Sequence, residues 1–245
     1  MFYIGSNDKL THFRTIFVRP RASSLEMHNN HLNNQQIMRR LKKPESNQSV
    51  QKSRDELQKY WQNPDEMNFT LGHLKGGKRS EYLVSLVKQY VKPDASILEL
   101  GCNVGSNLYH LWKSGYHNLS GIEINPEALK LMKQNFPEMQ VITYEGSIED
   151  RIKKLGKYDL VFTMAVLEHL HIDSEWVFSE TARRAKRYLI TIEGEKKILS
   201  KLHISRNYKN IFERLGLQQV YEKHLNQDEG LNTNFYARVF LRNHC

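Results

Sequence analysis

Hydrophobic positions in the chain change their spacing repeatedly after about residue 78. Residues 78–91 place apolar side chains on one face of a helix, and this pattern stops before Pro93. Short apolar runs, typical of buried strands, then alternate with segments of helical spacing. The predicted strands span residues 95–100, 118–124, 139–146, 158–164 and 187–195. The predicted helices span residues 105–115, 125–136, 147–156, 173–186 and 204–216.

Two late segments, residues 217–225 and 234–243, alternate apolar and polar positions with a period of two and predict a pair of strands. The alternation of strands and helices before them is typical of a parallel sheet covered on both faces. We therefore predict an α/β fold: a doubly wound, mostly parallel seven-stranded sheet with helices on both faces and a C-terminal antiparallel hairpin. In such a fold, ligands bind beyond the carboxyl ends of the strands.

Cap signals mark several helix boundaries. Asn125 is a predicted N-cap followed by a proline at the first helical position, and Asp173 or Ser174 is the predicted cap of the helix over 173–186. Ser53 or Asp55 starts a further helix that stops near Asn63.

Three regions follow from composition along the chain. Residues 1–52 are rich in Asn, Gln, Ser and basic residues, which predicts a flexible basic polar tail. Residues 53–81 form a predicted N-terminal helical segment that acts as a lid. Residues 82–245 carry the alternating pattern and form the predicted catalytic domain.

The totals narrow the function classes. The formal net charge is +9 and the sequence pI is about 9.4, which raises nucleic acid as a partner. The basic residues are spread out, however, and no RNA-binding signature with interleaved aromatic residues accompanies them. No apolar run reaches the roughly 18 residues that a membrane span needs, and the N-terminus lacks the apolar centre of a secretory signal. With only two cysteines, the expectation is a reducing, cytoplasmic location.

The turn after the first predicted strand, in "ILELGCNVGSN", has the composition of a ligand site. Gly101 allows the chain to reverse where a side chain would block a ligand, and Gly105 allows close approach of the next helix. Asn103 tolerates the left-handed backbone conformation better than most residues, so it replaces a glycine at moderate cost.

Acidic residues at two strand ends indicate the chemistry of the ligand. Glu99 argues against a diphosphate and favours a ligand with a positive charge. The spacing also departs from the G-x-G-x-x-G pattern of dinucleotide sites. Glu123 ends the second strand about 20 residues after Gly101, where an acid accepts hydrogen bonds from ribose hydroxyls. The predicted ligand therefore contains a ribose and a cationic part.

Four segments in order, "ILELGCNVGSN", "GIEINPEAL", "YEGSIED" and "YDLVFTMAVLEHL", resemble the successive motifs of class I S-adenosylmethionine-dependent methyltransferases. The resemblance covers about residues 82–193 and implies the Rossmann-like fold of that family with S-adenosyl-L-methionine as cofactor. It implies that the ligand's methionine part lies beside the first loop, that Glu123 binds the ribose, and that Ile124 packs beside the adenine. The implied cofactor-binding residues are Glu99, Gly101, Cys102, Asn103, Gly105, Glu123, Ile124, Gly146, Ser147, Ile148 and Met164.

Two positions depart from the family pattern. Ser147 stands where the family often has an aspartate for the adenine amino group, and its hydroxyl remains a candidate for that hydrogen bond. Asn103 replaces the middle glycine of the first motif. By the same resemblance, Met164 and Ala165 end the fourth strand, where a backbone carbonyl commonly faces the methionine amine.

His169 is the predicted catalytic residue, because it follows the fourth strand at the mouth of the expected crevice and has a pKa suited to a general base. The alternative is a histidine that packs on the loop or caps it. Some relatives carry E-x-x-E-H here and bind a divalent ion with it. In this chain Ala165 replaces the first acid, leaving two ligands, so no metal is predicted.

Residues before the domain are candidates for the substrate side. Tyr60, Trp61 and His73 are predicted to line the substrate space, and Lys78 with Arg79 to meet an anionic group. For the aromatic residues, packing of an amphipathic helix is an equal alternative.

The predicted function is an S-adenosylmethionine-dependent methyltransferase (EC 2.1.1.-) that moves a methyl group to an O or N atom of a small-molecule metabolite. The first alternative is an RNA or protein methyltransferase, which the basic tail favours. The second is a non-catalytic, cofactor-binding regulatory module. The sequence makes no prediction of oligomeric state.

Overall fold

A computed structural model of the protein describes residues 52–65, 77–196 and 200–243, which lie within one compact unit, Ser49–Cys245. Its sheet has seven strands in the order β3-β2-β1-β4-β5-β7-β6. Strands β1 to β5 pair in parallel, and β7 is antiparallel to both β5 and β6. The predicted fold is therefore confirmed. The strands are β1 Ile97–Leu100, β2 Leu119–Glu123, β3 Ile142–Glu145, β4 Tyr158–Met164, β5 Ala185–Gly194, β6 Leu217–His224 and β7 Phe235–Arg242.

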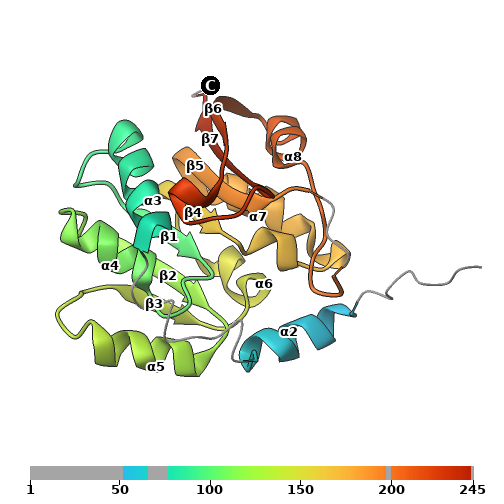
Figure 1. Ribbon diagram of the computed structural model, residues 1–245, viewed down its shortest axis with the longest axis horizontal. Helices are drawn as coiled ribbons and strands as arrows, with labels where there is room; N and C mark the ends of the chain where they lie inside the picture. Colours follow the sequence, from blue (N-terminus) through green and yellow to red (C-terminus); the bar gives the residue numbers. More distant parts are fainter. Residues whose placement is uncertain (1–51, 66–76, 197–199, 244–245) are drawn as a thin grey trace, which may run out of the picture. The chain divides into compact units, whose positions relative to one another are not determined.

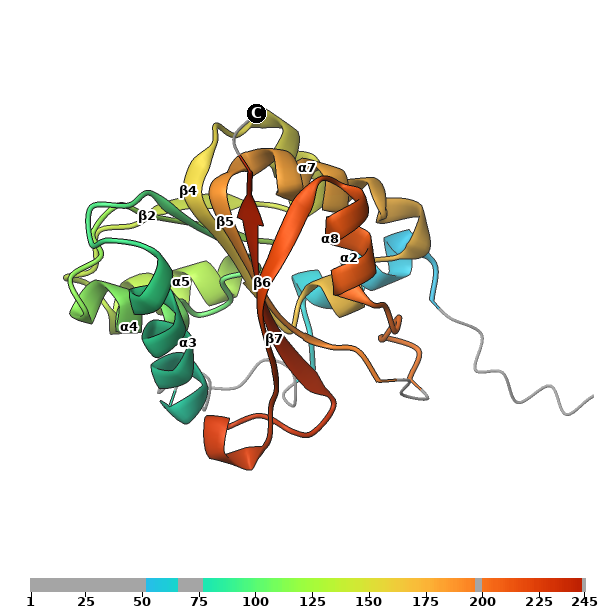
Figure 2. The ribbon, with the colours of Figure 1, turned by 90° about the horizontal axis from the view of Figure 1, so that it is seen from above.

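Helices cover both faces of this sheet (Figures 1 and 2). One core cluster joins one face to α3 (Gly77–Tyr90), α4 (Ser106–Lys113) and α5 (Pro126–Asn135). The other cluster joins the opposite face to α6 (Ile148–Arg151), α7 (Trp176–Arg184) and α8 (Tyr208–Arg214). Four short 3₁₀ turns lie between these elements: η2 Ile152–Lys154, η3 Leu167–His169, η4 Ile172–Ser174 and η5 Gln227–Glu229.

Strand β1 is buried on both faces, which explains its continuous apolar run. Ile97 packs in the cluster of α3, α4 and α5, whereas Leu98 and Leu100 pack in the other cluster. Side chains alternate along a strand, so Glu99 shares the face of Ile97 and is directed toward α4. A carboxyl group is thus placed inside the core at the end of a central strand.

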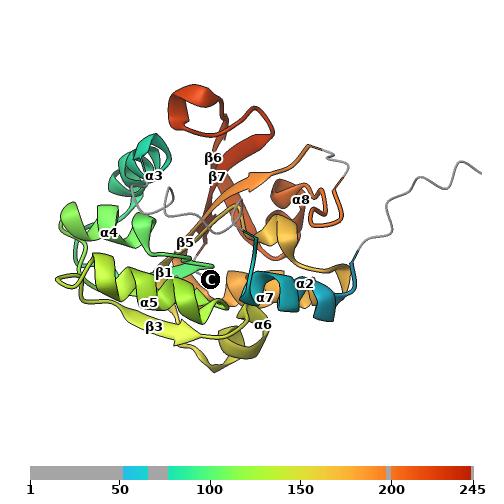
Figure 3. The same cartoon turned by 60° about the horizontal axis from the view of Figure 1, so that its bottom comes forward.

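Helix α2 (Arg54–Gln62) begins with a capping box formed by Ser53 and Glu56, which confirms the predicted start at Ser53. It contacts η4, and Figure 3 shows it in blue near α6 and α7. The tail predicted for residues 1–52 lies almost entirely outside the described residues.

Two helix starts differ from the sequence prediction. Neither Asp173 nor Ser174 caps α7; the cap position is Glu175, and the Ser174 hydroxyl instead donates to Glu149 Oε1 at 2.8 Å. The helix predicted over 204–216 starts only at Tyr208, where the Asn207 side chain caps it. Ile204 and Arg206, which precede it, bond instead to carbonyl oxygens of the turn after β4. None of the helices in the described ranges is long and apolar enough to cross a membrane.

Candidate active site

A pocket of about 240 Å³ lies where β1, β2 and β4 end. It brings together thirteen of the predicted site residues: Trp61, Arg79, Glu99, Gly101, Cys102, Asn103, Glu123, Ile124, Gly146, Ser147, Ile148, Met164 and His169. Gly105, Tyr60 and Lys78 do not line it. His73 lies outside the described residues.

The loop from β1 to α4 has the predicted left-handed backbone. Gly101, Asn103 and Gly105 have φ angles of 73°, 48° and 76°. The glycines serve packing as much as ligand access. A Cβ atom on Gly101 would lie 2.6 Å from Val166 Cγ2, and one on Gly105 would collide with the side chain of Met132 on α5. Gly105 therefore allows the close approach of α5, and it does not line the pocket.

Cys102 is a buried free thiol, and burial raises its pKa well above the ordinary value. Both Cys102 N–H and Gly101 N–H donate to the carbonyl of Ile122 at 2.9 Å, which fixes the loop to β2. Gly121 makes this contact possible, because a Cβ atom there would lie 2.7 Å from Cys102 Sγ. The sequence analysis missed Gly121, although a glycine inside a strand is a known sign of close backbone approach.

Glu99 is 1% exposed and only half satisfied. Its Oε1 accepts from Asn107 Nδ2 at 2.8 Å, while its buried Oε2 has no hydrogen-bond partner. Burial raises the pKa of Glu99 to about 8, and the hydrogen bond from Asn107 and the charge of Arg79 oppose this rise. A buried, unpaired carboxyl oxygen at a pocket wall fits a cationic ligand group, because such a group would satisfy it.

Glu123 bridges two loops. Its Oε2 accepts from Asn103 N–H at 2.7 Å and its Oε1 from Asn125 N–H at 2.9 Å. Burial raises the pKa of Glu123, and these backbone hydrogen bonds oppose the rise. Each oxygen keeps a second acceptor position. The carboxyl group therefore fits the predicted role toward paired hydroxyls and also holds the β1–α4 loop, which the sequence did not reveal.

Ser147 is already engaged at the opposite end of the pocket. Its hydroxyl donates to Asp150 Oδ2 at 2.7 Å and accepts from Asp150 N–H at 3.1 Å, so it caps α6. The hydroxyl hydrogen of Ser147 is therefore not available to a ring nitrogen of the adenine. The hydroxyl oxygen can only accept a hydrogen bond, for example from the adenine amino group. Ile124 and Ile148 also line the pocket.

His169 lies on the β4 side of the pocket, in η3. Its Nδ1 is 2.8 Å from the carbonyl oxygen of Leu202, which assigns the proton to Nδ1 and leaves Nε2 with a lone pair. The Trp61 ring packs against it with 4.5 Å between centroids. Burial lowers the pKa of His169 below the ordinary value, so the ring is neutral at pH 7. Tyr60 instead donates to Asp65 Oδ2 at 2.8 Å, outside the pocket.

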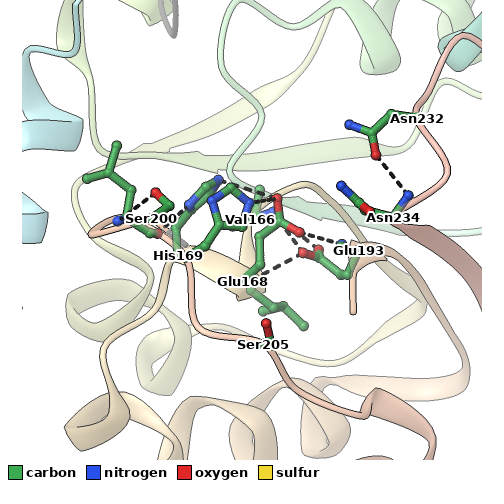
Figure 4. A network of polar contacts seen from close by, with 12 residues as sticks. Val166, Glu168, His169, Glu193, Ser200, Ser205, Asn232 and Asn234 are labelled. Carbon is green, nitrogen blue, oxygen red and sulfur yellow. Dashed lines mark hydrogen bonds and ion pairs between the residues drawn. The ribbon is translucent and has the colours of Figure 1, made fainter. Parts of the chain in front are cut away.

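A buried polar network supports η3, and Figure 4 shows Glu168, His169 and Glu193 grouped within it. Glu168 Oε1 lies 2.8 Å from His203 Nε2, and its Oε2 accepts from Gly194 N–H. Glu193 accepts from Val166 N–H at 3.0 Å and Glu168 N–H at 3.3 Å. Burial, then the charge of Glu168, raises the pKa of Glu193 to about 8.

Arg206 ties the chain before α8 to the same turn. It is 8% exposed and donates to the carbonyl oxygens of Leu167 at 3.2 Å and Leu170 at 2.9 Å. It also donates to Glu175 Oε1 at 3.1 Å. Sequence reasoning assigned no role to Glu193, His203 or Arg206, because their partners lie far away in the chain.

The sequence region that forms this pocket matches a known family. Residues 97–187 match a family model described as "Methyltransferase domain". This stretch of the chain is therefore similar to a methyltransferase domain. The resemblance of the four motifs to this family is thereby confirmed, and the matched region runs from β1 into β5.

Solved methyltransferase structures share the fold of this domain. Magnesium protoporphyrin IX methyltransferase (ChlM) from Synechocystis PCC 6803, with bound SAH, is 16% identical; the match covers 78% of this chain and 100% of that chain with a TM-score of 0.60. A putative methyltransferase of Haloferax volcanii, in complex with the Trm112 activator, is 14% identical over 79% and 100% of the chains with a TM-score of 0.61. A TehB-like SAM-dependent methyltransferase of Corynebacterium glutamicum is 21% identical over 65% and 86%, with a TM-score of 0.53.

The methyltransferase domain has the fold of these proteins, and the predicted cofactor is the one with which the Synechocystis enzyme was also crystallised.

Proposed function

We propose that the protein transfers a methyl group from S-adenosylmethionine to an O or N atom of a small molecule. The observation that carries this proposal is the pair of buried acids at the ends of β1 and β2. Glu99 presents an unpaired carboxyl oxygen, and Glu123 presents a carboxyl held by two backbone N–H groups, to one pocket.

The residues fit the parts of the cofactor. Glu99 would face the methionine ammonium group, and the Arg79 guanidinium, which lines the same pocket, would face the methionine carboxylate. Glu123 would accept from the ribose hydroxyls. Ile124 and Ile148 would flank the adenine, which needs apolar contacts on its faces.

Bound S-adenosylmethionine supplies a methyl group that its sulfonium already activates. The chain then has to align the acceptor and exclude water. Helix α2 contributes to this with Leu57, Gln58 and Trp61, which line the pocket. His169 Nε2 is the basic nitrogen near the acceptor, because the hydrogen bond from Nδ1 to Leu202 fixes the tautomer.

The pocket volume of about 240 Å³ and the residues of α2 that line it support a small acceptor over a polymer. The alternative of an RNA or protein acceptor keeps the support of the basic excess of the chain. A non-catalytic cofactor-binding module is the remaining alternative.

A labelling experiment separates the three. The protein is incubated with methyl-labelled S-adenosylmethionine and fractionated cell extract, and label is followed into small-molecule, protein and RNA fractions. Label in the small-molecule fraction is expected. Label in RNA or protein instead would show that the acceptor is a polymer and not a small molecule. Tight binding of S-adenosylhomocysteine together with no labelled product in any fraction would favour the non-catalytic module.

A further inference from the structure

We propose that Glu168, His169 and His203 form a binding site for one divalent first-row transition-metal ion on the acceptor side of the pocket. Glu168 and His169 belong to η3, while His203 comes from the segment before α8. The binding of the ion does not depend on the proposed function. The further step, in which the ion binds the methyl acceptor, rests on the proposed function.

The three ligand atoms converge on one point. One carboxyl oxygen and one nitrogen from each ring lie within 4.8 Å of one another. Glu168 Oε1 is 2.8 Å from His203 Nε2 and 3.6 Å from His169 Nε2. Metal–ligand bonds of about 2.1 Å at octahedral to tetrahedral angles place neighbouring ligand atoms roughly 3.0–3.4 Å apart. The observed separations bracket this range.

Outer hydrogen bonds orient the ligands. His169 Nδ1 is held by the carbonyl of Leu202, so the Nε2 lone pair is directed toward the cluster. Glu168 Oε2 accepts from Gly194 N–H, whereas Oε1 contacts His203 Nε2 at 2.8 Å; the ion would replace this contact once His203 carries its proton on Nδ1. Protein metal sites commonly fix ligating histidines and carboxylates by such bonds from their second polar atom. The separation of 3.6 Å between the Nε2 lone pair of His169 and Glu168 Oε1 leaves room for a cation to bind both atoms.

Charge supports the same conclusion. Glu168 and Glu193 are 2% and 0% exposed, and the Glu193 carboxyl accepts from Glu168 N–H at 3.3 Å. Two neighbouring buried carboxyl groups are costly without a compensating positive charge. A divalent ion bound by Glu168 and two neutral imidazoles would provide that charge.

The ligand set selects the kind of ion. Two imidazole nitrogens and one carboxylate suit Zn²⁺, Co²⁺, Mn²⁺ or Fe²⁺, whereas Mg²⁺ and Ca²⁺ prefer oxygen ligands. Three protein ligands leave at least one coordination position open. Because His169 lines the pocket, an oxygen or nitrogen atom of the acceptor is the group that would occupy it. With the ion bound, His169 Nε2 is a ligand and no longer a free base, and the ion itself would lower the pKa of the bound acceptor atom. Ala165 lines the pocket nearby and offers no ligand atom.

Cobalt provides a direct probe. Untagged full-length protein, stripped with a chelator, is titrated with Co²⁺ while its visible absorption is followed, and Zn²⁺ is then added as competitor. One equivalent of Co²⁺ is expected to produce the absorption of a nitrogen- and oxygen-ligated ion, and Zn²⁺ should displace it. His203→Ala and Glu168→Gln should each weaken binding by at least about tenfold, because each removes one ligand.

His224→Ala is the matched control, since His224 lies on β6 and bonds to the carbonyl of Thr233. It should leave the titration unchanged. Circular dichroism and S-adenosylhomocysteine binding in chelator report whether each variant is folded.

Three results would overturn the metal site: no cobalt absorption in the wild-type chain, unchanged cobalt affinity in the folded His203→Ala variant, or displacement of Co²⁺ by equimolar Mg²⁺. Wild-type protein that binds S-adenosylhomocysteine but no cobalt removes the ion and leaves the proposed function standing. Protein that binds cobalt at these residues but does not bind S-adenosylhomocysteine would leave the metal site standing and would contradict the proposed function.

Discussion

The two sides of the pocket differ in how far apart in the chain their hydrogen-bonded residues lie and in whether their carboxyl oxygens have partners. On the side of β1 and β2, Glu99 is bonded to a residue eight positions away and keeps one oxygen without a partner. On the side of β4 and β5, the bonds of Glu168 and Arg206 span 26 to 39 positions. Both carboxyl oxygens of Glu168 are engaged there. The first side leaves bonding capacity for a ligand, whereas the second uses its capacity to hold the turn after β4.

This difference predicts that substitutions on the two sides separate binding from folding. Residues of the first side should control cofactor affinity with limited effect on stability. Residues of the second side should control stability with limited effect on cofactor affinity.

Arg206→Met should have the largest effect and should act on stability. The change leaves the buried carbonyl oxygens of Leu167 and Leu170 without donors, so the free energy of unfolding should fall by about 3 kcal/mol. Denaturant unfolding measures this, with Arg183→Ala, at a side chain 69% exposed, as the control within about 0.5 kcal/mol. A parallel collapse of S-adenosylhomocysteine affinity in folded protein would erase the distinction between the two sides.

Glu123→Ala should have the next largest effect and should act on binding. It removes the acceptor for the ribose hydroxyls and for Asn103 N–H, so S-adenosylhomocysteine affinity should fall by about 1–3 kcal/mol in calorimetry. Glu127→Ala, on the exposed face of α5 where Glu127 pairs with Lys130, should leave affinity unchanged. An equal loss in both variants would show that the effect is not specific to the pocket.

The raised pKa of Glu99 should be detectable as a release of protons when the ligand binds. Because its pKa is raised to about 8, the carboxyl is mostly protonated in the free protein at pH 7 and must ionise to face an ammonium group. Binding of S-adenosylhomocysteine at pH 7 should therefore release protons, and affinity should rise from pH 6 to 8. Calorimetry in buffers of different ionisation enthalpy measures the release, which Glu99→Gln should abolish.

The same shift fixes the sign of a stability effect. A carboxyl whose folded pKa lies above its ordinary value of 4.5 favours the folded state at low pH. In the free protein, this contribution is lost as the pH rises through about 8. The pH dependence of unfolding in the Glu99→Gln variant should be correspondingly flatter, and an unchanged slope would contradict the raised pKa.

Asn103 should give the smallest effect. With φ at 48°, Asn103→Gly should change the free energy of unfolding by no more than about 0.5 kcal/mol, whereas Asn103→Ala should cost about 1 kcal/mol. Thermal unfolding of both variants measures the difference. A larger loss for the glycine variant would mean that the asparagine side chain itself supports the loop.

These contrasts explain what the sequence could predict. The β1–α4 loop, Glu99 and Glu123 carry their signal in short motifs, because backbone sterics and strand ends are local properties. The mostly parallel sheet followed from the alternation of helices and strands, whereas the order of its strands was not predicted. His203 and Arg206 had no such signal, since only the folded chain brings them to η3. The start of α8 was misplaced for the same reason: Ile204 N–H bonds to the carbonyl of Glu168 instead of entering the helix.

The bridge made by Arg206 also bears on how ligands enter and leave. The hydrogen bonds of Arg206 to the carbonyl oxygens of Leu167 and Leu170 must both break before η3 can move. Helix α2, whose Trp61 packs on His169, instead lines the pocket with apolar side chains such as Leu57, and apolar contacts tolerate gradual sliding. We therefore expect the cofactor and the product to enter and leave past α2, while the turn after β4 stays in place.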